Sequence, residues 1–149
     1  MLSKRAIPDG FTPCRFEVPV PFSDAMDLYH RVHDQGIVIG IWVDEHYRNG
    51  GQMAHGGFLM ALGDIATGHA TSELMGTDRY TVHVSFNMNF YSSVPIGCWL
   101  EVHGKVNRRG REIVFASCDY IVNGAVLGHA DAVLKSAPIK TGREAVRDA

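Results

Sequence analysis

The segment Asn49–Asp64 reads NGGQMAHGGFLMALGD and joins a polar loop to an apolar helix. The HGG at positions 55–57 stands where the helix begins, so the backbone N–H groups of the first turn have no intrahelical partners. Two glycines leave these donors accessible to a ligand, and the helix dipole favours an oxygen that carries negative charge. This arrangement suits an acyl thioester, whose carbonyl oxygen becomes anionic during attack.

Asp64 lies seven residues after Gly57, about two helical turns further along the same face. At that depth it does not cap the helix. Its neighbours include Leu62 and Ile65, and an ionised carboxylate on a buried helix is costly unless it is paired. We therefore interpret Asp64 either as a structural carboxylate bonded to nearby backbone or as a functional one.

The rest of the chain predicts one long helix and several long antiparallel strands. Apolar positions at helical spacing run from Gly56 to about Leu74, and Gly76 follows as a stop. Positions 80–91 alternate between apolar and polar residues, which predicts a long strand with one polar face. Further strands are expected at 28–32, 37–43, 98–107, 112–122 and 125–135. Together these elements predict an α+β architecture, with a curved sheet around the helix.

The two ends of the chain are expected to add little to the sheet. Four prolines within residues 1–21 indicate an extended N-terminal arm. Residues 136–149 read as a polar C-terminal tail.

The pattern N-x5-H-G-G-x6-D resembles the signature of the hotdog-fold acyl-CoA thioesterases, in particular the PaaI-like branch of the 4-hydroxybenzoyl-CoA thioesterase superfamily. The resemblance covers most of the chain, from Tyr29 to about Lys135, because the order of strands, Asn loop, HGG helix and Gly-Arg turn also matches. It implies a hotdog fold, in which a curved antiparallel sheet wraps a long central helix, formed by residues 1–149 as a single domain.

The resemblance also implies roles in the HGG segment. Asp64 would be the catalytic carboxylate, acting on water as a general base or attacking the thioester itself. Gly56, with Gly57 beside it, would supply the N–H that holds the thioester oxygen, and a turn needed only for close packing is the alternative. Asn49 would orient water or the acyl carbonyl, or act as a turn residue. His55 would polarise the carbonyl or, as we favour, fix the loop through a backbone group.

A basic turn and a strand end are the expected contacts for coenzyme A. The turn consists of Arg108, Arg109, Gly110 and Arg111. Its guanidinium groups are either solvated or bind the phosphates of CoA. The resemblance places further CoA contacts near Tyr91 and Ser92.

His83 is a departure from the family, since relatives often carry Ser or Thr at this strand position. It is interpreted as an extra acid or base, as a determinant of the acyl group, or as an outward-facing residue. Gly68 occupies the position, one helical turn after Asp64, where relatives sometimes carry a hydroxyl. Thr67 is adjacent and is expected to point elsewhere.

Composition excludes several other classes of protein. The 149 residues carry a formal net charge of −2 without long runs of either sign, which argues against nucleic-acid or polybasic membrane surfaces. No stretch approaches the roughly 18 apolar residues of a membrane span. Three widely spaced cysteines and one close histidine pair, His30 and His33, indicate neither a disulfide framework nor a metal site. We expect a soluble cytoplasmic protein without metal or cofactor.

The leading functional prediction is hydrolysis of an acyl-CoA to the free acid and CoA. The resemblance implies a homodimer, with dimers paired further, in which Asp64 of one subunit faces Asn49, His55 and Gly56 of the other. The alternatives are a non-catalytic acyl-CoA-binding or regulatory protein and, with less support, a hotdog hydratase or dehydratase. Aromatic, short and longer acyl groups all remain open.

Overall fold

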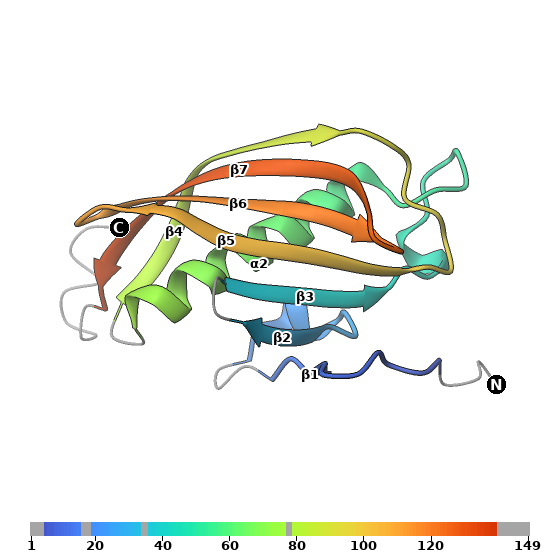
Figure 1. Cartoon of the computed structure of the whole chain (residues 1–149), viewed down its shortest axis with the longest axis horizontal. Helices are drawn as coiled ribbons and strands as arrows, with labels where there is room; N and C mark the ends of the chain where they lie inside the picture. Colours follow the sequence, from blue (N-terminus) through green and yellow to red (C-terminus); the bar gives the residue numbers. More distant parts are fainter. Residues whose placement is uncertain (1–4, 16–18, 34–35, 77–78, 140–149) are drawn as a thin grey trace.

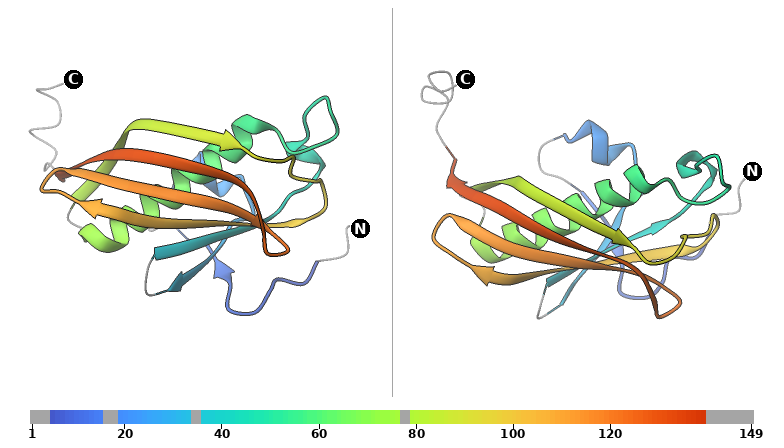
Figure 2. Two further views of the ribbon diagram at one scale, coloured as in Figure 1. Left: turned by 45° about the horizontal axis from the view of Figure 1, so that its top comes forward. Right: turned by 90° about the horizontal axis from the view of Figure 1, so that it is seen from above.

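A seven-stranded antiparallel sheet curves around one long helix (Figures 1 and 2). The computed structural model describes residues 5–15, 19–33, 36–76 and 79–139. The elements are β1 (Thr12–Pro13), α1 (Pro21–Asp24), β2 (Tyr29–His33), β3 (Gly36–Trp42), the 3-10 turn η1 (Glu45–Tyr47), α2 (Gly56–Met75), β4 (Arg79–Phe90), β5 (Trp99–Arg109), β6 (Ile113–Val122) and β7 (Ala125–Pro138). The strand order is β1-β2-β3-β5-β6-β7-β4. The predicted α+β architecture is confirmed.

Helix α2 begins and ends as the sequence predicts. The His55 side chain caps its N-terminus by accepting a hydrogen bond from Gly57 N–H at 3.0 Å. Gly76, with φ of 91°, ends it in a conformation that favours glycine. Because the sheet wraps the helix, residues on most of its circumference are buried. The buried ones are Phe58, Leu59, Leu62, Gly63, Ile65, Ala66, Thr67, Ala70, Thr71 and Met75.

Two glycines allow α2 to lie directly on the sheet. A Cβ on Gly104 of β5 would come within 2.5 Å of the Ala66 carbonyl oxygen. A Cβ on Gly63 would lie 2.1 Å from the Tyr120 hydroxyl oxygen, which itself donates to the Leu59 carbonyl at 2.8 Å. Any side chain at either glycine would therefore force the helix away from the sheet.

The chain ends differ from the prediction in detail. The N-terminal arm contains β1, which pairs with β2, and its last residue, Pro21, begins the short helix α1. Strand β7 extends to Pro138, so three residues assigned to the polar tail belong to the sheet. Ser136 is among them, and its side chain is fully buried. Residues 140–149 of the predicted tail, residues 1–4 and 16–18 of the arm, and the turn at 34–35 lie outside the described residues.

The prediction of a single polar face on strand β4 is wrong, because a β-bulge between His83 and Ser85 reverses its two faces. Before the bulge, Thr81 and His83 are partly buried, whereas Tyr80, Val82 and Val84 are exposed. After it the apolar residues are the partly buried ones, among them Phe86 and Met88. An extra residue in a strand shifts the alternation by one, and the sequence pattern alone carries no sign of it.

Strand β4 is an edge of the sheet, with β7 on one side only (Figure 1). Its exposed apolar side chains are unusually many for a strand that faces water. They are Tyr80, Val82, Val84 and Phe90, followed by Tyr91 in the next loop. Long apolar edges are normally covered or paired.

Candidate active site

The first turn of α2 leaves the Gly56 N–H group free. Gly57 N–H is occupied, since it donates to His55 Nδ1. Within the described residues, the structure gives Gly56 N–H no hydrogen-bond partner, as expected for the first turn of a helix. A Cβ on Gly56 would lie 3.3 Å from the Phe90 ring, so this glycine sits against the end of β4. Because His55 Nδ1 accepts a hydrogen bond, its Nε2 carries the proton in the neutral ring.

The loop before α2 is fixed by its own side chains. Asn49 Oδ1 accepts hydrogen bonds from Gly51 N–H at 2.8 Å and Met53 N–H at 3.2 Å, so the side-chain carbonyl stabilises the turn. The Asn49 Nδ2 group lies 3.5 Å from the Ala54 carbonyl oxygen, a weak contact that leaves donor capacity free. The Tyr47 ring stacks on Phe58 at 3.9 Å, and burial, helped by nearby carboxylates, raises the pKa of its hydroxyl.

A hollow of about 410 Å³ brings four of the predicted residues together. Its lining is mixed, with polar groups from the loops and apolar side chains from α2 and β4. It is lined by Asn49, Met53, Ala54, Gly56, Leu59, Phe90, Tyr91, Ser92, Ser93 and Val94. The predicted residues Asn49, Gly56, Tyr91 and Ser92 thus share one site, although they come from three separate segments of the chain.

Asp64 lies elsewhere in the same chain, and the interpretation of a carboxylate buried in the helix is wrong. Its side chain is 58% exposed. Eight residues of α2 separate it from Gly56, a rise of about 12 Å. The helix is buried on its sheet side, but Asp64 stands on the side that borders the open edge of β4, next to His83. One chain therefore holds the carboxylate and the free N–H at different places.

His83 bridges the edge strand and the helix. Its Nδ1 lies 3.0 Å from Asp64 Oδ1, and its Nε2 lies 2.9 Å from Thr67 Oγ1. The outward-facing interpretation is wrong, because the bulge turns this ring toward α2. Thr67 was expected to point elsewhere, yet it follows Asp64 by three residues, and residues at i and i+3 share a helix face. That spacing was the signal in the sequence that identifies Thr67.

The basic turn divides into two parts. Arg109 donates to the Leu74 carbonyl at 3.5 Å, a weak contact in which a cation faces the C-terminal end of α2. Arg108 and Arg111 instead line an open hollow of about 530 Å³. Gly110 shapes the turn, because a Cβ there would lie 2.6 Å from the Ile113 carbonyl oxygen. The turn lies at the far end of α2 from Gly56.

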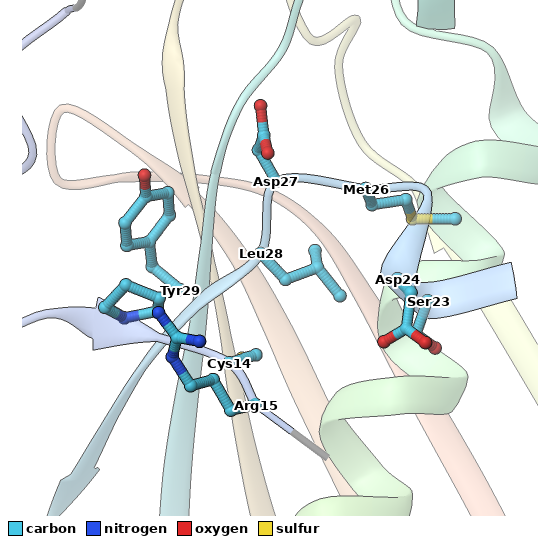
Figure 3. A pocket seen from close by; sticks show the side chains of 9 residues that line it. Cys14, Arg15, Ser23, Asp24, Met26, Asp27, Leu28 and Tyr29 are labelled. Atoms are coloured by element: carbon cyan, nitrogen blue, oxygen red, sulfur yellow. The ribbon is translucent and has the colours of Figure 1, made fainter. Parts of the chain in front are cut away.

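A third hollow, of about 230 Å³, lies between the end of β1 and the segment that runs from α1 to the start of β2 (Figure 3). Cys14, Arg15, Asp24 and Tyr29 are among the residues that line it, and none of the predicted site residues is. The described part of the chain contains no group of three or more His, Cys, Asp or Glu side chains placed to hold a metal ion. No helix in the described ranges is long and apolar enough to cross a membrane.

Residues 51–126 match the model of the family described as "Thioesterase superfamily". They include the HGG helix start, Asp64, His83 and the basic turn. The chain belongs to the thioesterase superfamily. A curated relative points the same way, the Pseudomonas aeruginosa protein named "Putative esterase PA0474". It is 31% identical over 116 residues, which cover 74% of this chain and 83% of the relative.

Solved structures place this superfamily member among hotdog folds. A conserved protein from Pseudomonas aeruginosa, PA5202, aligns with a TM-score of 0.75 at 22% identity, over 80% of this chain and 95% of its own. A variant of the phenylacetic acid degradation protein PaaI from Thermus thermophilus aligns with a TM-score of 0.70 at 21% identity, over 78% and 98% of the chains. A hypothetical thioesterase from Streptococcus pneumoniae, solved with coenzyme A, gives a TM-score of 0.67 at 20% identity, over 74% and 88%. The predicted hotdog fold and PaaI-like resemblance are confirmed, and the family supports a thioester hydrolase.

Proposed function

We propose that this protein hydrolyses an acyl-CoA thioester to the free acid and CoA, at a site shared between two copies of the chain. The observation that carries the proposal is where the two halves of the site, the Gly56 N–H and the Asp64 carboxylate, lie along the unpaired edge strand β4. Gly56 adjoins its Phe90 end, and Asp64 lies 3.0 Å from His83, nearer its start. Each chain then holds both halves of a site, separated along one edge.

Antiparallel pairing of two copies of β4 would unite these halves. A two-fold axis near Phe86 and Asn87, midway between His83 and Phe90, sets the His83 end of one strand opposite the Phe90 end of the other. Asp64 of one chain then faces Gly56 of its partner, because each is in contact with one of these ends. The same pairing covers the exposed apolar residues of the edge. We further propose that such dimers pair into a dimer of dimers.

The chemistry follows from the groups that meet at the shared site. The Gly56 N–H, at the positive end of α2, would bind the thioester oxygen as it becomes anionic. His55 Nε2–H lies on the same turn as a second donor. Asp64 would either accept a proton from the water that attacks the carbonyl carbon, or attack that carbon to form a mixed anhydride that water then cleaves. In both routes the CoA thiolate leaves, and the carboxylate must be ionised.

Coenzyme A would extend from the site along the chain that supplies Asp64. The C-terminal end of α2, Met75, lies eleven residues beyond Asp64, a rise of about 17 Å. There Arg108 and Arg111 line the open hollow and would bind the phosphates, whereas Arg109 donates to a carbonyl at the end of the helix. Tyr91 and Ser92, on the partner's side of the site, would contact the pantetheine arm. The reaction needs no cofactor, and we propose a cytoplasmic location for it.

Two substitutions at one backbone position test the oxyanion role. Gly56 is the first residue of α2, where proline is favoured, and His55 before it has ψ of 133°, which suits the residue before a proline. Gly56→Pro therefore removes the N–H with little change in backbone, and Gly56→Ala keeps it. Against a panel of aromatic and aliphatic acyl-CoAs, we expect Gly56→Pro to lose about 10²–10³-fold in kcat and Gly56→Ala to lose far less.

The same panel separates the enzyme from the alternative, a non-catalytic acyl-CoA-binding protein. Asp64→Asn should lower kcat by about 10²–10⁴-fold, as expected for loss of a general base or nucleophile. CoA esters that bind to the wild type without turnover would overturn the catalytic proposal and favour the binding protein.

A further inference from the structure

Three side chains are in contact in a row from the interior of the protein to the candidate carboxylate. Thr67 is fully buried, the His83 side chain is 17% exposed, and the Asp64 side chain is 58% exposed. The contacts are 2.9 Å from Thr67 Oγ1 to His83 Nε2 and 3.0 Å from His83 Nδ1 to Asp64 Oδ1. The imidazole therefore stands between a fixed anchor and an exposed reactive group.

The proton on Thr67 decides which nitrogen of the ring is the donor. Thr67 Oγ1 lies 2.7 Å from the Gly63 carbonyl oxygen, a distance at which the hydroxyl donates its single proton to that carbonyl. Oγ1 must then accept from His83, so Nε2 carries a proton. The anchored ring turns Nδ1 toward Asp64 Oδ1, at 3.0 Å.

This geometry also limits what His83 can do. A general base needs a free nitrogen within reach of the substrate. Nε2 is turned to the buried Thr67, and Nδ1 faces the Asp64 carboxylate at 3.0 Å. The exposed group of the pair is the carboxylate, whose Oδ2 is free of His83. His83 therefore acts through Asp64 and not on the substrate.

We infer that His83 is a positioning residue, which is anchored by Thr67 and orients the Asp64 carboxylate for attack. The inference rests on the proposed function and names a residue on which that function depends. Asp64 is the charged group that faces His83 from α2. From β7 the cross-strand neighbour of His83 is the apolar Leu134, and on β4 itself Phe86 presents a ring at 6.1 Å.

The split between kcat and KM separates this role from a merely structural one. A misoriented carboxylate slows the attack without weakening the binding of the substrate. His83→Gln should therefore have a kcat roughly 10–100-fold lower than the wild type, with KM little changed. An unchanged kcat, or a loss confined to KM, would overturn the inference.

Two threonines on α2 provide a matched pair for the anchor. Thr67 and Thr71 are both fully buried, and both donate to the carbonyl four residues earlier, at 2.7 and 2.8 Å. In the structure Thr67 is the one that contacts His83. We expect Thr67→Val to lower kcat and Thr71→Val to leave it nearly unchanged. Equal effects of the two substitutions would show that the anchor has no role.

A spectroscopic test does not depend on turnover. Histidine-selective ¹⁵N spectra, with His83→Gln used for assignment, should show a proton on Nε2 of His83 in the wild type. Thr67→Val should change the Nε2 signal, and Thr71→Val should not. If the wild type shows this signature and hydrolyses nothing, the anchored ring stands and the proposed hydrolysis fails. A His83 without a proton on Nε2 in the wild type overturns the inference, whatever the activity.

Discussion

Asn87 on β4 and Asp131 on β7 are direct cross-strand partners, and Asn87 has no further strand beyond it. If two β4 edges pair about an axis near Asn87, its side chain approaches the same side chain of the partner. We expect Asn87→Cys to form a disulfide-linked dimer under mild oxidation, because cysteines whose Cα atoms lie within about 7 Å can be bridged. Non-reducing electrophoresis measures the cross-linked fraction.

Asp131→Cys is the control for this cross-link. Asp131 is also exposed and stands at the same level of the sheet, but one strand further from the edge. Two such residues would be separated by about 10 Å more than the Asn87 pair. Equal cross-linking of both variants, or a wild type that remains monomeric in light scattering, would contradict the proposed interface.

The close contact of helix and sheet predicts a large effect of a single methyl group. Gly63→Ala should destabilise the protein by about 1–3 kcal/mol, because the new Cβ would lie 2.1 Å from the Tyr120 hydroxyl oxygen. Gly68→Ala is the matched control on the same helix, since its Cβ would lie at an ordinary 3.6 Å from the His83 ring. It should be neutral or stabilising by up to about 1 kcal/mol. Denaturant unfolding measures both, and similar values for the two would contradict the packing described above.

The native thiols should react slowly while the protein is folded. Burial raises the pKa of Cys14 to about 11 and that of Cys118 to about 12, and it also raises the pKa of Cys98. At pH 8 the thiolate fractions of Cys14 and Cys118 are then about 10⁻³ and 10⁻⁴. A chromogenic disulfide reagent should modify three thiols per chain only after unfolding. Rapid labelling of the folded wild type would contradict this, and slow labelling permits the same reagent to detect released CoA.

His129 on the outer face of the sheet predicts a pH-dependent stability. Its Nδ1 lies 2.7 Å from Asp119 Oδ1, and this hydrogen bond, followed by the charge of Asp119 and then the nearby Asp131, raises the pKa of His129 against the opposing effect of burial. A raised pKa means that the stabilisation is complete below about pH 6.5 and is lost as pH rises through the folded value. His129→Gln should therefore lower the free energy of unfolding by less than about 1 kcal/mol near pH 6, since the pair is partly exposed, and by still less near pH 8. An equal loss of stability at pH 6 and pH 8 would contradict the raised pKa of His129.

Much of the fold could be predicted from the sequence because local signals and packing agree. Helix α2 has its cap at His55, its stop at Gly76 and apolar residues at helical spacing, and its bounds differ from the prediction by one residue. The Asn49 loop and the Gly110 turn were also identified by their residue types, which suit the backbone found there.

The position of Asp64 could not be derived from its neighbours in the sequence. Leu62 and Ile65 indicated a buried helix, and both are buried, but Asp64 projects toward the edge that β4 leaves open. Burial of a helix is not uniform around its axis, and the open side depends on which strand is last in the sheet. Strand order is a long-range property that periodicity does not encode.

The environment of His83 depends on one inserted residue. Without the bulge beside Val84, His83 would share a face with Ser85 and Asn87 and would point away from α2. The His83 contacts to Asp64 and Thr67 thus follow from an irregularity in the β4–β7 register, whereas the Asp64–Thr67 spacing was visible in the chain.

Co-assembly of two inactive variants tests the shared thioesterase site most directly. Asp64→Asn and Gly56→Pro are each expected to be nearly inactive alone. In a two-fold dimer that contains one chain of each, one site is doubly defective and the other has both intact residues. When the variants are co-expressed in equal amounts and purified together, we expect about a quarter of the wild-type CoA release per chain, since half of the dimers are mixed and half of their sites are intact. Activity that stays at the level of the separate variants would contradict a site formed by Asp64 of one chain and Gly56 of the other.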